Sequence, residues 1–434
     1  MSQLLVGVGR EVSTPEIGAL LAGYAPRPST SVNDDLHITA FAFETNGNRA
    51  MLISADMCNI RDDTLVAVQN AMEEASGLPM GNLILACTHT HSGPSCYDTH
   101  YISTIFIPAL KKAIHTALSS MKPALMGIGT THSEVAINRR EIKENGKVAL
   151  GQNPFGSFDP TMTVVSFREP NGTPIGNLIH YGCHNTAAGS NPEITRDWCG
   201  VAVDRLEALS GGITCFFNGC GGDCGPRLTT GKTSGGNNIA LAMELGGHAA
   251  SDAVRAWRSI SIWHDAPLHV LCEDIALPLR KLPSLEEMYQ QKGKMESDNS
   301  SHFIDKGTYN ILLERIAYLE AGTVPAATKP ISTSLICIGP VAFLPIPFEP
   351  FSMITLRIKQ ASPYPYTLCV GYANGAYSYF PSIDQIPRGG YEVEMFQTRN
   401  TVPFDDDSEQ YFVTGSLRML RTSHTGSLSE AVTY

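Results

Sequence analysis

The sequence predicts an α/β protein with mixed sheets and flanking helices, and a metal site at the carboxyl ends of strands. Three observations favour this class. Apolar runs of strand length alternate with helical patterns along the whole chain, no second compositional regime interrupts the alternation, and several apolar runs end in a histidine or a carboxylate.

The clearest local unit lies within residues 50–88. The runs AMLISADM and NLILAC have the pattern of buried strands, and the stretch DDTLVAVQNAMEEASG between them has apolar residues at helical spacing. Asp62 or Asp63 is the expected N-cap of this helix, and Gly77 is its expected C-terminal stop. The order strand, helix, strand predicts that the two strands are parallel.

The rest of the chain continues the alternation. Strands are expected at 162–167, 175–183, 213–219, 332–339, 341–347 and 367–375, and helices at 102–121, 197–209, 237–257 and 308–321. We expect a single catalytic domain over 1–434, with a mobile surface insertion near the polar stretch 292–301.

Composition narrows the function. The 434 residues are 43% hydrophobic and carry a net charge of −11, which disfavours nucleic acid or an anionic membrane surface as partner and favours a small-molecule substrate. There is no basic leader and no apolar window of membrane-spanning length, so a cytoplasmic protein without stable membrane insertion is expected. Its oligomeric state stays open.

The stretch LACTHTHSGPS holds the most informative pair. Side chains at i and i+2 point the same way when the backbone is extended, so His89 and His91 are expected to face one small volume. Asp56 follows the neighbouring strand and is expected at the same edge of the sheet. A metal site or an acid/base pair would present histidines in this way, and a structural hydrogen-bond network is the alternative.

Polar residues follow other strands too. His184 lies in YGCHNTAAG, Asp223 in FFNGCGGDCGPR, Glu349 in FLPIPFEPF, and Tyr377 and Tyr379 in GYANGAYSYFPS. Two histidines and a carboxylate form a zinc-ligand set that leaves a position open for a water whose pKa is lowered to about 7. The residues therefore permit a metal-activated hydrolase, although Glu349 alone also suits a helix N-terminus. Spacing alone cannot assemble them.

The order of these motifs resembles a known family. GVGREVSTPEIGALLAGYAPRPSTSVNDDLHITAFAFE, LISAD, THTHSGP, GCHNT, GGDCGP, PFEPF and GYANGAYSYFPS occur in the order of the neutral/alkaline (non-lysosomal) ceramidases, zinc-dependent amidases that hydrolyse N-acylsphingosine. The matches run from residue 7 to about 395. The chain resembles the N-terminal catalytic domain and is expected to be a short member without the C-terminal β-sandwich domain.

The resemblance implies a ligand set for one Zn²⁺ per chain. His89 and His184 resemble the first two zinc ligands. Glu349 matches the ligand glutamate, although a phenylalanine precedes it where the family has glycine. Tyr379 resembles the last ligand, with Tyr377 as the register alternative and a candidate for substrate binding. Whether a second metal binds stays open.

The resemblance also implies roles around the substrate. His91 resembles the residue that hydrogen-bonds to the substrate and exchanges protons with it, and Arg139 resembles an arginine that faces the scissile amide, with Arg140 one register away. Gly23 matches a glycine whose backbone lines the pocket. Asp223 suits a carboxylate that fixes a loop better than it suits a metal ligand.

The expected function is a zinc-dependent amidohydrolase that cleaves a linear carboxamide with a metal-activated water. The family's Gly-Gly after Ser-Gly-Pro is Ser95-Cys96 here, and its Gly-Asp-Val-Ser-Pro-Asn loop is GDCGPR. The acyl and amine halves of the substrate, and whether ceramide is accepted, therefore stay open. A zinc-dependent esterase or lactonase on the same scaffold and a non-catalytic metal-containing binding protein are the alternatives.

Overall fold

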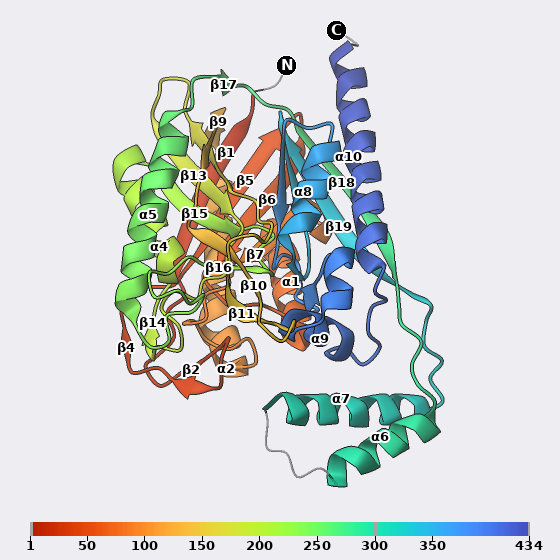
Figure 1. The fold of residues 1–434 in the computed structure, drawn as a ribbon. Helices are drawn as coiled ribbons and strands as arrows, with labels where there is room; N and C mark the ends of the chain where they lie inside the picture. The colour runs from red at the N-terminus through yellow and green to blue at the C-terminus, as the bar shows by residue number, and fades with distance from the viewer. Residues whose placement is uncertain (1–2, 298–302, 433–434) are drawn as a thin grey trace.

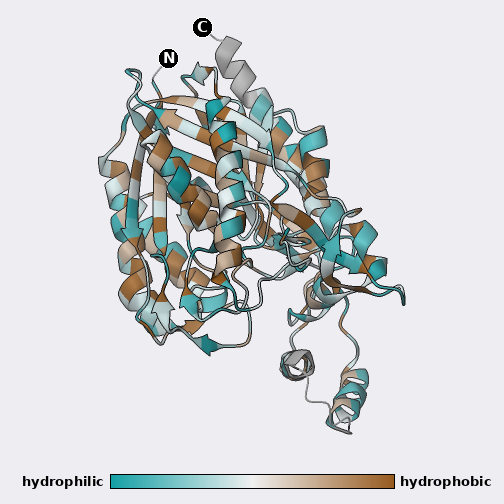
Figure 2. Cartoon of the chain, turned by 60° about the vertical axis from the view of Figure 1, so that its left-hand side comes forward, coloured by the Kyte–Doolittle hydropathy of each residue, from teal (hydrophilic) through white to brown (hydrophobic). Residues whose placement is uncertain are grey.

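The computed structural model describes residues 3–297 and 303–432. In this part of the chain two five-stranded sheets lie face to face, and helices cover the outer side of each, so the layers run helix, sheet, sheet, helix (Figure 1). Hydrophobic residues line the strands between the helix layers, and hydrophilic residues lie mostly on the outside (Figure 2). The predicted α/β class with mixed sheets and flanking helices is confirmed.

The first sheet has the strand order β7-β6-β5-β1-β8. Its strands are β1 (Leu5–Val12), β5 (His37–Thr45), β6 (Asn48–Ala55), β7 (Leu83–Cys87) and β8 (Lys122–Pro123). β6 and β7 are parallel, as predicted, and the other neighbours are antiparallel. Its outer face packs on α1 (Asp62–Ser76) and on a run of α2 (Thr99–Tyr101), a π-helical turn η2 (Ile102–Phe106) and α3 (Ile107–Ser119).

The ends of α1 test the capping prediction. The expected stop is confirmed, since Gly77 adopts the left-handed conformation with φ 67° and donates its N–H to the Glu73 carbonyl. The N-cap prediction is wrong, because Arg61 holds that position and no side chain caps the helix. The Asp62 carboxylate instead accepts a hydrogen bond from the Tyr97 hydroxyl, at 2.8 Å.

The second sheet has the strand order β15-β13-β12-β9-β17. Its strands are β9 (Leu125–His132), β12 (Thr161–Arg168), β13 (Pro174–Tyr181), β15 (Ile213–Asn218) and β17 (Trp263–His264), and its outer face packs on α4 (Asp197–Ser210) and α5 (Ile239–Arg258). The inner faces of the two sheets meet through aromatic rings. Phe167 lies 6.0 Å from Phe41 and 5.3 Å from Phe43 between ring centroids.

A third, four-stranded sheet has the order β18-β19-β20-β22. Its strands are β18 (Leu268–Pro278), β19 (Thr328–Ile338), β20 (Val341–Pro345) and β22 (Tyr366–Val370), and its helices are α8 (Ser352–Ala361) and α10 (Ser408–Val432). The short elements are β2 (Leu20–Leu21), β3 (Arg27–Pro28), β4 (Ser31–Val32), η1 (Met80–Asn82), β10 (Ala136–Ile142), β11 (Val148–Asn153), β14 (Glu193–Ile194), β16 (Cys224–Pro226), β21 (Glu349–Pro350), β23 (Tyr379–Phe380), η3 (Ile383–Arg388) and α9 (Tyr391–Thr398).

Residues 279–327, here called the arm, interrupt the third sheet. β18 and β19 pair along their whole length, from Leu268 opposite Ile338 to Pro278 opposite Thr328, and the arm leaves from that last pair. It holds α6 (Leu285–Ser297) and α7 (Phe303–Glu320) and projects from the body (Figure 1).

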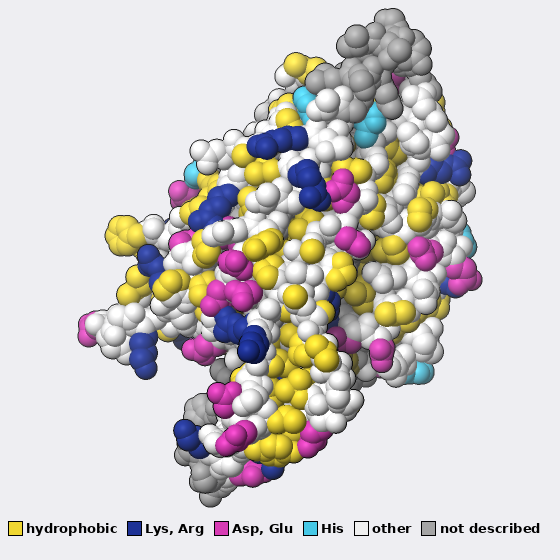
Figure 3. Space-filling view, turned by 90° about the vertical axis from the view of Figure 1, so that its right-hand side faces the viewer, with side chains coloured by type: hydrophobic (Ala, Val, Ile, Leu, Met, Phe, Trp, Pro, Cys, Tyr) yellow, Lys and Arg dark blue, Asp and Glu magenta, His cyan; other side chains and the backbone are white. Residues whose placement is uncertain are grey.

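Hydrophobic side chains gather along the arm and where it joins the body (Figure 3). Part of the predicted mobile insertion, 292–297, is the end of α6, and 298–301 lies outside the described residues. No helix in the described part of the chain is long and apolar enough to cross a membrane.

Candidate functional site

Three candidate metal-ligating side chains meet where strands end. His89 follows β7, His184 follows β13, and Glu349 begins β21. The Glu349 Oε2 atom lies 3.5 Å from His89 Nε2 and 3.4 Å from His184 Nε2. One nitrogen of each ring and one carboxylate oxygen thus lie within 4.8 Å of one another, although the residues are far apart in the sequence. We call these three residues the cluster.

The backbone at His89 differs from the expected extended form. Its φ is +66°, a left-handed conformation, and its N–H donates to the Met57 carbonyl at 2.9 Å. The chain has therefore left β7 before the histidine pair begins. The two rings nevertheless face one volume, since His89 Nε2 and His91 Nε2 lie 3.2 Å apart. The predicted convergence is confirmed, and its predicted cause, an extended strand, is wrong.

Backbone carbonyls orient both cluster histidines. His89 Nδ1 lies 2.7 Å from the Cys58 carbonyl oxygen, and His184 Nδ1 lies 2.8 Å from the Gly221 carbonyl oxygen. A carbonyl only accepts, so each Nδ1 carries the proton and each Nε2 keeps a free lone pair. Both lone pairs belong to the atoms nearest Glu349. This second contact is the arrangement that fixes metal-ligating histidines in proteins.

The charge states of the cluster suit a cation. Burial lowers the pKa of His89 to about 3 and also lowers the pKa of His184, so both rings are neutral near pH 7. Burial alone would raise the pKa of Glu349, but His89, His184 and Arg139 hold it well below its ordinary value. Among the described residues, His184 Nε2 and Glu349 Oε2 are buried without a hydrogen-bond partner. The cluster is therefore a candidate metal-ligand group.

Tyr379 adjoins the cluster through a backbone pairing. β21 and β23 are parallel, with Glu349 opposite Tyr379. The Tyr379 ring stacks on the His184 ring, with centroids 6.3 Å apart. Tyr377 contacts other residues, because its ring packs on Phe348 and Phe404 and lies under the Lys329 ammonium. Between the two registers, the geometry brings Tyr379 to the cluster.

Arg139 reaches the same place, and Arg140 does not. Arg139 Nη2 donates to the Tyr379 hydroxyl at 2.9 Å, and its Nε donates to Glu392 at 2.8 Å. Arg140 Nη1 also binds Glu392, at 2.7 Å, while its Nη2 donates to the Gly389 carbonyl. Glu392, which is 1% exposed, thus binds both guanidinium groups. Beyond this shared contact the two arginines bind different partners.

His91 lies between the cluster and a glycine. A Cβ at Gly23 would lie 2.3–2.7 Å from three atoms of His91, so only glycine leaves room for the ring. Gly23 has φ +84° and is exposed. The Tyr24 ring meets the His91 ring edge to face at 4.8 Å, and Arg27 Nη2 donates to the His91 carbonyl at 2.6 Å. His91 is thus held from its open side by 23–27.

Sequence reasoning missed four residues of the site. Tyr372 stacks on His89 at 4.1 Å, Tyr391 meets Tyr379 edge to face at 5.6 Å, Glu392 holds Arg139, and the Cys58 carbonyl orients His89. A signal existed only for Tyr372, which follows β22 as His89 follows β7.

The loop-fixing interpretation of Asp223 fits the structure. Its carboxylate accepts hydrogen bonds from the N–H and the hydroxyl of Ser352 and from the Asn138 amide. Its carbonyl accepts the N–H of Arg139 at 2.8 Å. Asp223 therefore ties the start of α8 to the strand that carries Arg139, and burial raises its pKa to about 6.

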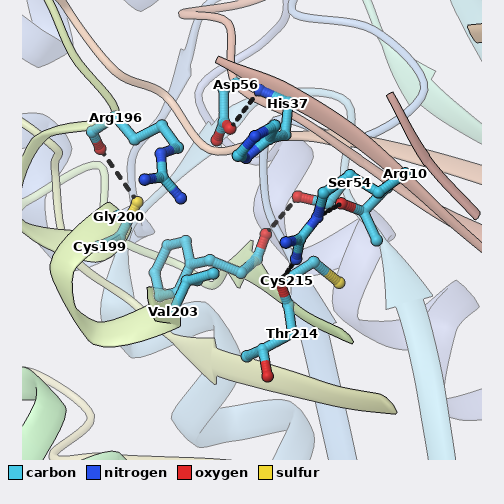
Figure 4. Close-up of a pocket in the computed structure, with 12 residues that line it drawn as sticks. Arg10, His37, Ser54, Asp56, Arg196, Cys199, Gly200, Val203, Thr214 and Cys215 are labelled. Carbon is cyan, nitrogen blue, oxygen red and sulfur yellow. Dashed lines mark hydrogen bonds between the residues drawn. The ribbon is translucent and has the colours of Figure 1, made fainter. Parts of the chain in front are cut away.

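Asp56 lies at this edge as expected, directly after β6, but it does not join the cluster. It lines a separate cavity between the two large sheets and α4 (Figure 4), together with Arg10, His37, Ser54 and Arg196. Its Oδ2 accepts the backbone N–H of His37 at 2.8 Å. Asp56 faces the same side as Ser54, two residues earlier on β6, as the alternation of side chains along a strand predicts.

The comparisons with known proteins agree on one family. Residues 4–228 match the family described as neutral/alkaline non-lysosomal ceramidase, N-terminal. Neutral ceramidase A of Dictyostelium discoideum is 26% identical over 235 residues, 49% of this chain and 33% of that protein. Neutral ceramidase of Pseudomonas aeruginosa is 26% identical over 171 residues, 36% of this chain and 26% of that protein. The matched segments thus span about a quarter to a third of these relatives.

A solved structure has the same fold over a longer stretch. The crystal structure of neutral ceramidase from Pseudomonas aeruginosa superposes with a TM-score of 0.74 at 18% identity, covering 97% of this chain and 74% of that chain. A structure titled as ceramidase complexed with C2 gives a TM-score of 0.72 at 17% identity, covering 97% and 75%.

Proposed function

The chain belongs to the neutral/alkaline, non-lysosomal ceramidase family, and we propose that it is a zinc-dependent hydrolase of linear carboxamides. The observation that carries the proposal is the cluster itself, where two neutral imidazoles and a carboxylate converge and where His184 Nε2 and Glu349 Oε2 are buried without a partner among the described residues. In this proposal His89, His184 and Glu349 hold one Zn²⁺, and Tyr379 is the fourth ligand. When bound, the ion would supply a water of lowered pKa as the nucleophile.

His91 is the proposed proton carrier. Burial holds the pKa of His91 well below its ordinary value, so its ring is neutral, and its Nε2 faces the cluster. With His89 Nε2 engaged as a metal ligand, His91 Nε2 would be free to accept a proton from the attacking water. The same atom then donates the proton to the leaving nitrogen. An amide needs this donation because an amide anion is a very poor leaving group.

Arg139 is the proposed stabiliser of the negative charge that develops on the carbonyl oxygen. Its guanidinium is buried, and Glu392 and Tyr379 fix its orientation. A fixed cation in a site that excludes water stabilises such a charge more strongly than a mobile one. Gly23 and Tyr377 are proposed to contact the substrate.

The proposal treats the whole chain as one catalytic domain, because its ligands come from residues 89 to 379. A cytoplasmic location stays a prediction of the sequence. The amide class follows from the relatives, which are named neutral ceramidases. An esterase or lactonase on the same scaffold is the second candidate, and matched ester and amide substrates separate the two.

The first test is metal content by elemental mass spectrometry, on wild type and His184→Ala. We expect about one zinc per chain in the wild type and none in the variant, with amide hydrolysis lost in parallel. His115→Ala, on the exposed face of α3, is the matched control and should keep both. A metal-free wild type that still hydrolyses amides would refute the proposed mechanism.

A further inference from the structure

A buried thiol lies beside the histidine pair and has no role in the proposed reaction. Cys58 Sγ, one nitrogen of His89 and one nitrogen of His91 lie within 4.8 Å of one another, and all three residues are buried. Cys58 Sγ lies 3.7 Å from His89 Nδ1, and His89 Nε2 lies 3.2 Å from His91 Nε2. Neither His184 nor Glu349 belongs to this group, which we call the thiol site.

The spacing of these atoms suits a metal ion. Ligands about 2.0–2.3 Å from one ion lie about 3–4 Å apart in a tetrahedral arrangement, and the two distances above fall in this range. A thiolate with two imidazoles is a ligand set for soft cations, because sulfur prefers them. The cluster has a carboxylate in place of sulfur, so the two sites should prefer different ions.

Cys58 differs from the other thiols of the chain. Of the eleven cysteines, ten are buried and Cys272 is exposed. Within residues 3–297 and 303–432, Cys58 is the one cysteine that lies in such a group of three metal-ligating side chains. The Asn59 amide donates to Cys58 Sγ at 3.7 Å, a contact that stabilises the negative sulfur of a metal-bound thiolate.

The tautomer of His91 is not fixed as those of the cluster histidines are. His91 Nδ1 is buried without a hydrogen-bond partner among the described residues. No carbonyl therefore holds the proton on one nitrogen of this ring, and Nε2 can present its lone pair beside His89. His91 can thus serve as a metal ligand as well as a proton carrier.

His89 can serve only one ion at a time. A neutral imidazole has a single lone pair, since its other nitrogen carries the proton. If Nε2 binds an ion at the thiol site, that atom is lost to the cluster. If Nδ1 binds there, the proton moves to Nε2 and blocks the same atom. The thiol site and the cluster therefore exclude each other through His89.

We propose that Cys58, His89 and His91 form a second, inhibitory site for soft metal cations such as Cd²⁺. On binding, the thiol releases its proton to solvent and the sulfur bonds to the metal, with no change of oxidation state. The ion takes His89 from the cluster and occupies His91, the proposed proton carrier. The site itself stands without the proposed function, and only the loss of hydrolysis rests on that function.

The first test measures binding without turnover, through the ultraviolet charge-transfer band of a cadmium–thiolate bond. Cd²⁺ is titrated into His184→Ala, whose cluster has lost a ligand, and into the same protein with one further substitution. We expect a band that saturates at about one Cd²⁺ per chain in His184→Ala. Adding Cys58→Ser should abolish the band, and adding His91→Ala should weaken binding at least about tenfold.

The matched control adds Cys272→Ser, at the exposed cysteine, and should leave the titration unchanged. A band that is absent from His184→Ala, that survives Cys58→Ser or that does not weaken with His91→Ala would overturn the site. Zinc-loaded wild type beside zinc-loaded Cys58→Ser repeats the comparison without a cluster variant, should His184→Ala not fold.

The second test asks whether the two sites exclude each other. In zinc-loaded wild type we expect the band to need at least about tenfold more Cd²⁺ than in His184→Ala, and the zinc content to fall as the band grows. Cd²⁺ binding that is equally tight in both proteins and leaves the zinc in place would overturn the shared role of His89.

The third test measures inhibition of amide hydrolysis, each protein relative to its own rate without Cd²⁺. Cys58→Ser keeps the backbone carbonyl that accepts from His89 Nδ1, so the orientation of that ring does not depend on the thiol. The wild type should be inhibited at a Cd²⁺ concentration at least about tenfold lower than Cys58→Ser. Equal sensitivity would overturn the inhibitory role. A Cys58-dependent band in a protein that hydrolyses no amide would refute the proposed function and leave the site.

Discussion

Two buried polar regions adjoin the ends of β6 and β7, and they are built differently. In the cavity of Figure 4, Arg10 binds Glu207, Arg196 binds Asp34 and Asp204, and Asp56 accepts a backbone N–H. In the cluster, His184 Nε2 and Glu349 Oε2 have no partner among the described residues. Both regions carry charge away from water, but only one leaves ligand atoms free.

The difference separates structural from functional polarity. Buried polar groups are almost always paired, so pairing explains the cavity as part of the scaffold. An unpaired set of lone pairs in one small volume costs stability unless a ligand binds there. Burial alone does not distinguish the cluster from the cavity, because both regions contain buried polar side chains.

The largest effect should come from Glu349→Gln. The amide keeps the shape of the side chain but removes the negative charge that faces both histidines, so metal affinity should fall at least about 100-fold and activity with it. Metal content after dialysis against graded chelator measures this. An unchanged metal affinity would mean that the cluster, like the cavity, has only a structural role.

His91→Ala should lower turnover by about 10² to 10⁴, the usual contribution of general acid/base catalysis, while metal content stays at the wild-type level. Single-turnover kinetics beside elemental analysis separates the two quantities. Loss of the metal in this variant would make His91 a ligand, and an unchanged rate would remove it from the proton path.

Arg196→Ala addresses the other region. It leaves Asp34 and Asp204 without their shared cation, so the free energy of unfolding should fall by about 2–3 kcal/mol, less than for a fully buried pair because Asp204 is half exposed. Urea denaturation measures this loss. Metal content should not change, and a loss of metal would mean that the two regions are coupled.

The pH dependences contributed by Asp56 and by His89 should have opposite signs. Burial raises the pKa of Asp56 to about 6, so the folded state holds more protons than the unfolded state between about pH 4 and 6, and stability falls as pH rises through that window. His89, with a lowered pKa of about 3, contributes stability that is lost as pH falls from about 6.5 toward 3.

Asp56→Asn tests the smaller of these contributions. Between pH 5 and pH 8 the variant should lose on the order of 1 kcal/mol less stability than the wild type. Thermal denaturation of the metal-free proteins at both pH values measures the difference. Parallel curves for the two proteins would mean that the Asp56 carboxyl titrates in the same way folded and unfolded.

Much of the scaffold followed from local pattern. Apolar periodicity predicted the parallel strands β6 and β7 and the order of strands and helices, and one glycine predicted the end of α1 at Gly77. Both signals are local features of the sequence. The convergence of His89, His184 and Glu349 came from the family resemblance, because no spacing rule links residues that far apart. Their roles as ligands stay predictions.

The remainder depended on long-range geometry. The left-handed backbone at His89 arises where a strand ends, and apolar periodicity does not reach there. In the sequence, Glu392 is one polar residue among several in a short helix, yet its carboxylate accepts hydrogen bonds from two arginines of β10.

Because β18 and β19 pair along their whole length, the arm could be removed without opening the third sheet. Because Pro278 already lies opposite Thr328, a two-residue turn would close the hairpin, and the 49 residues of the arm are not needed to complete the sheet. Evolution can exchange such an insertion without rebuilding the core. Arg315 of the arm, however, donates hydrogen bonds to backbone carbonyls on both sides of Arg399. Exchange of the arm would therefore also change what holds the backbone that follows α9.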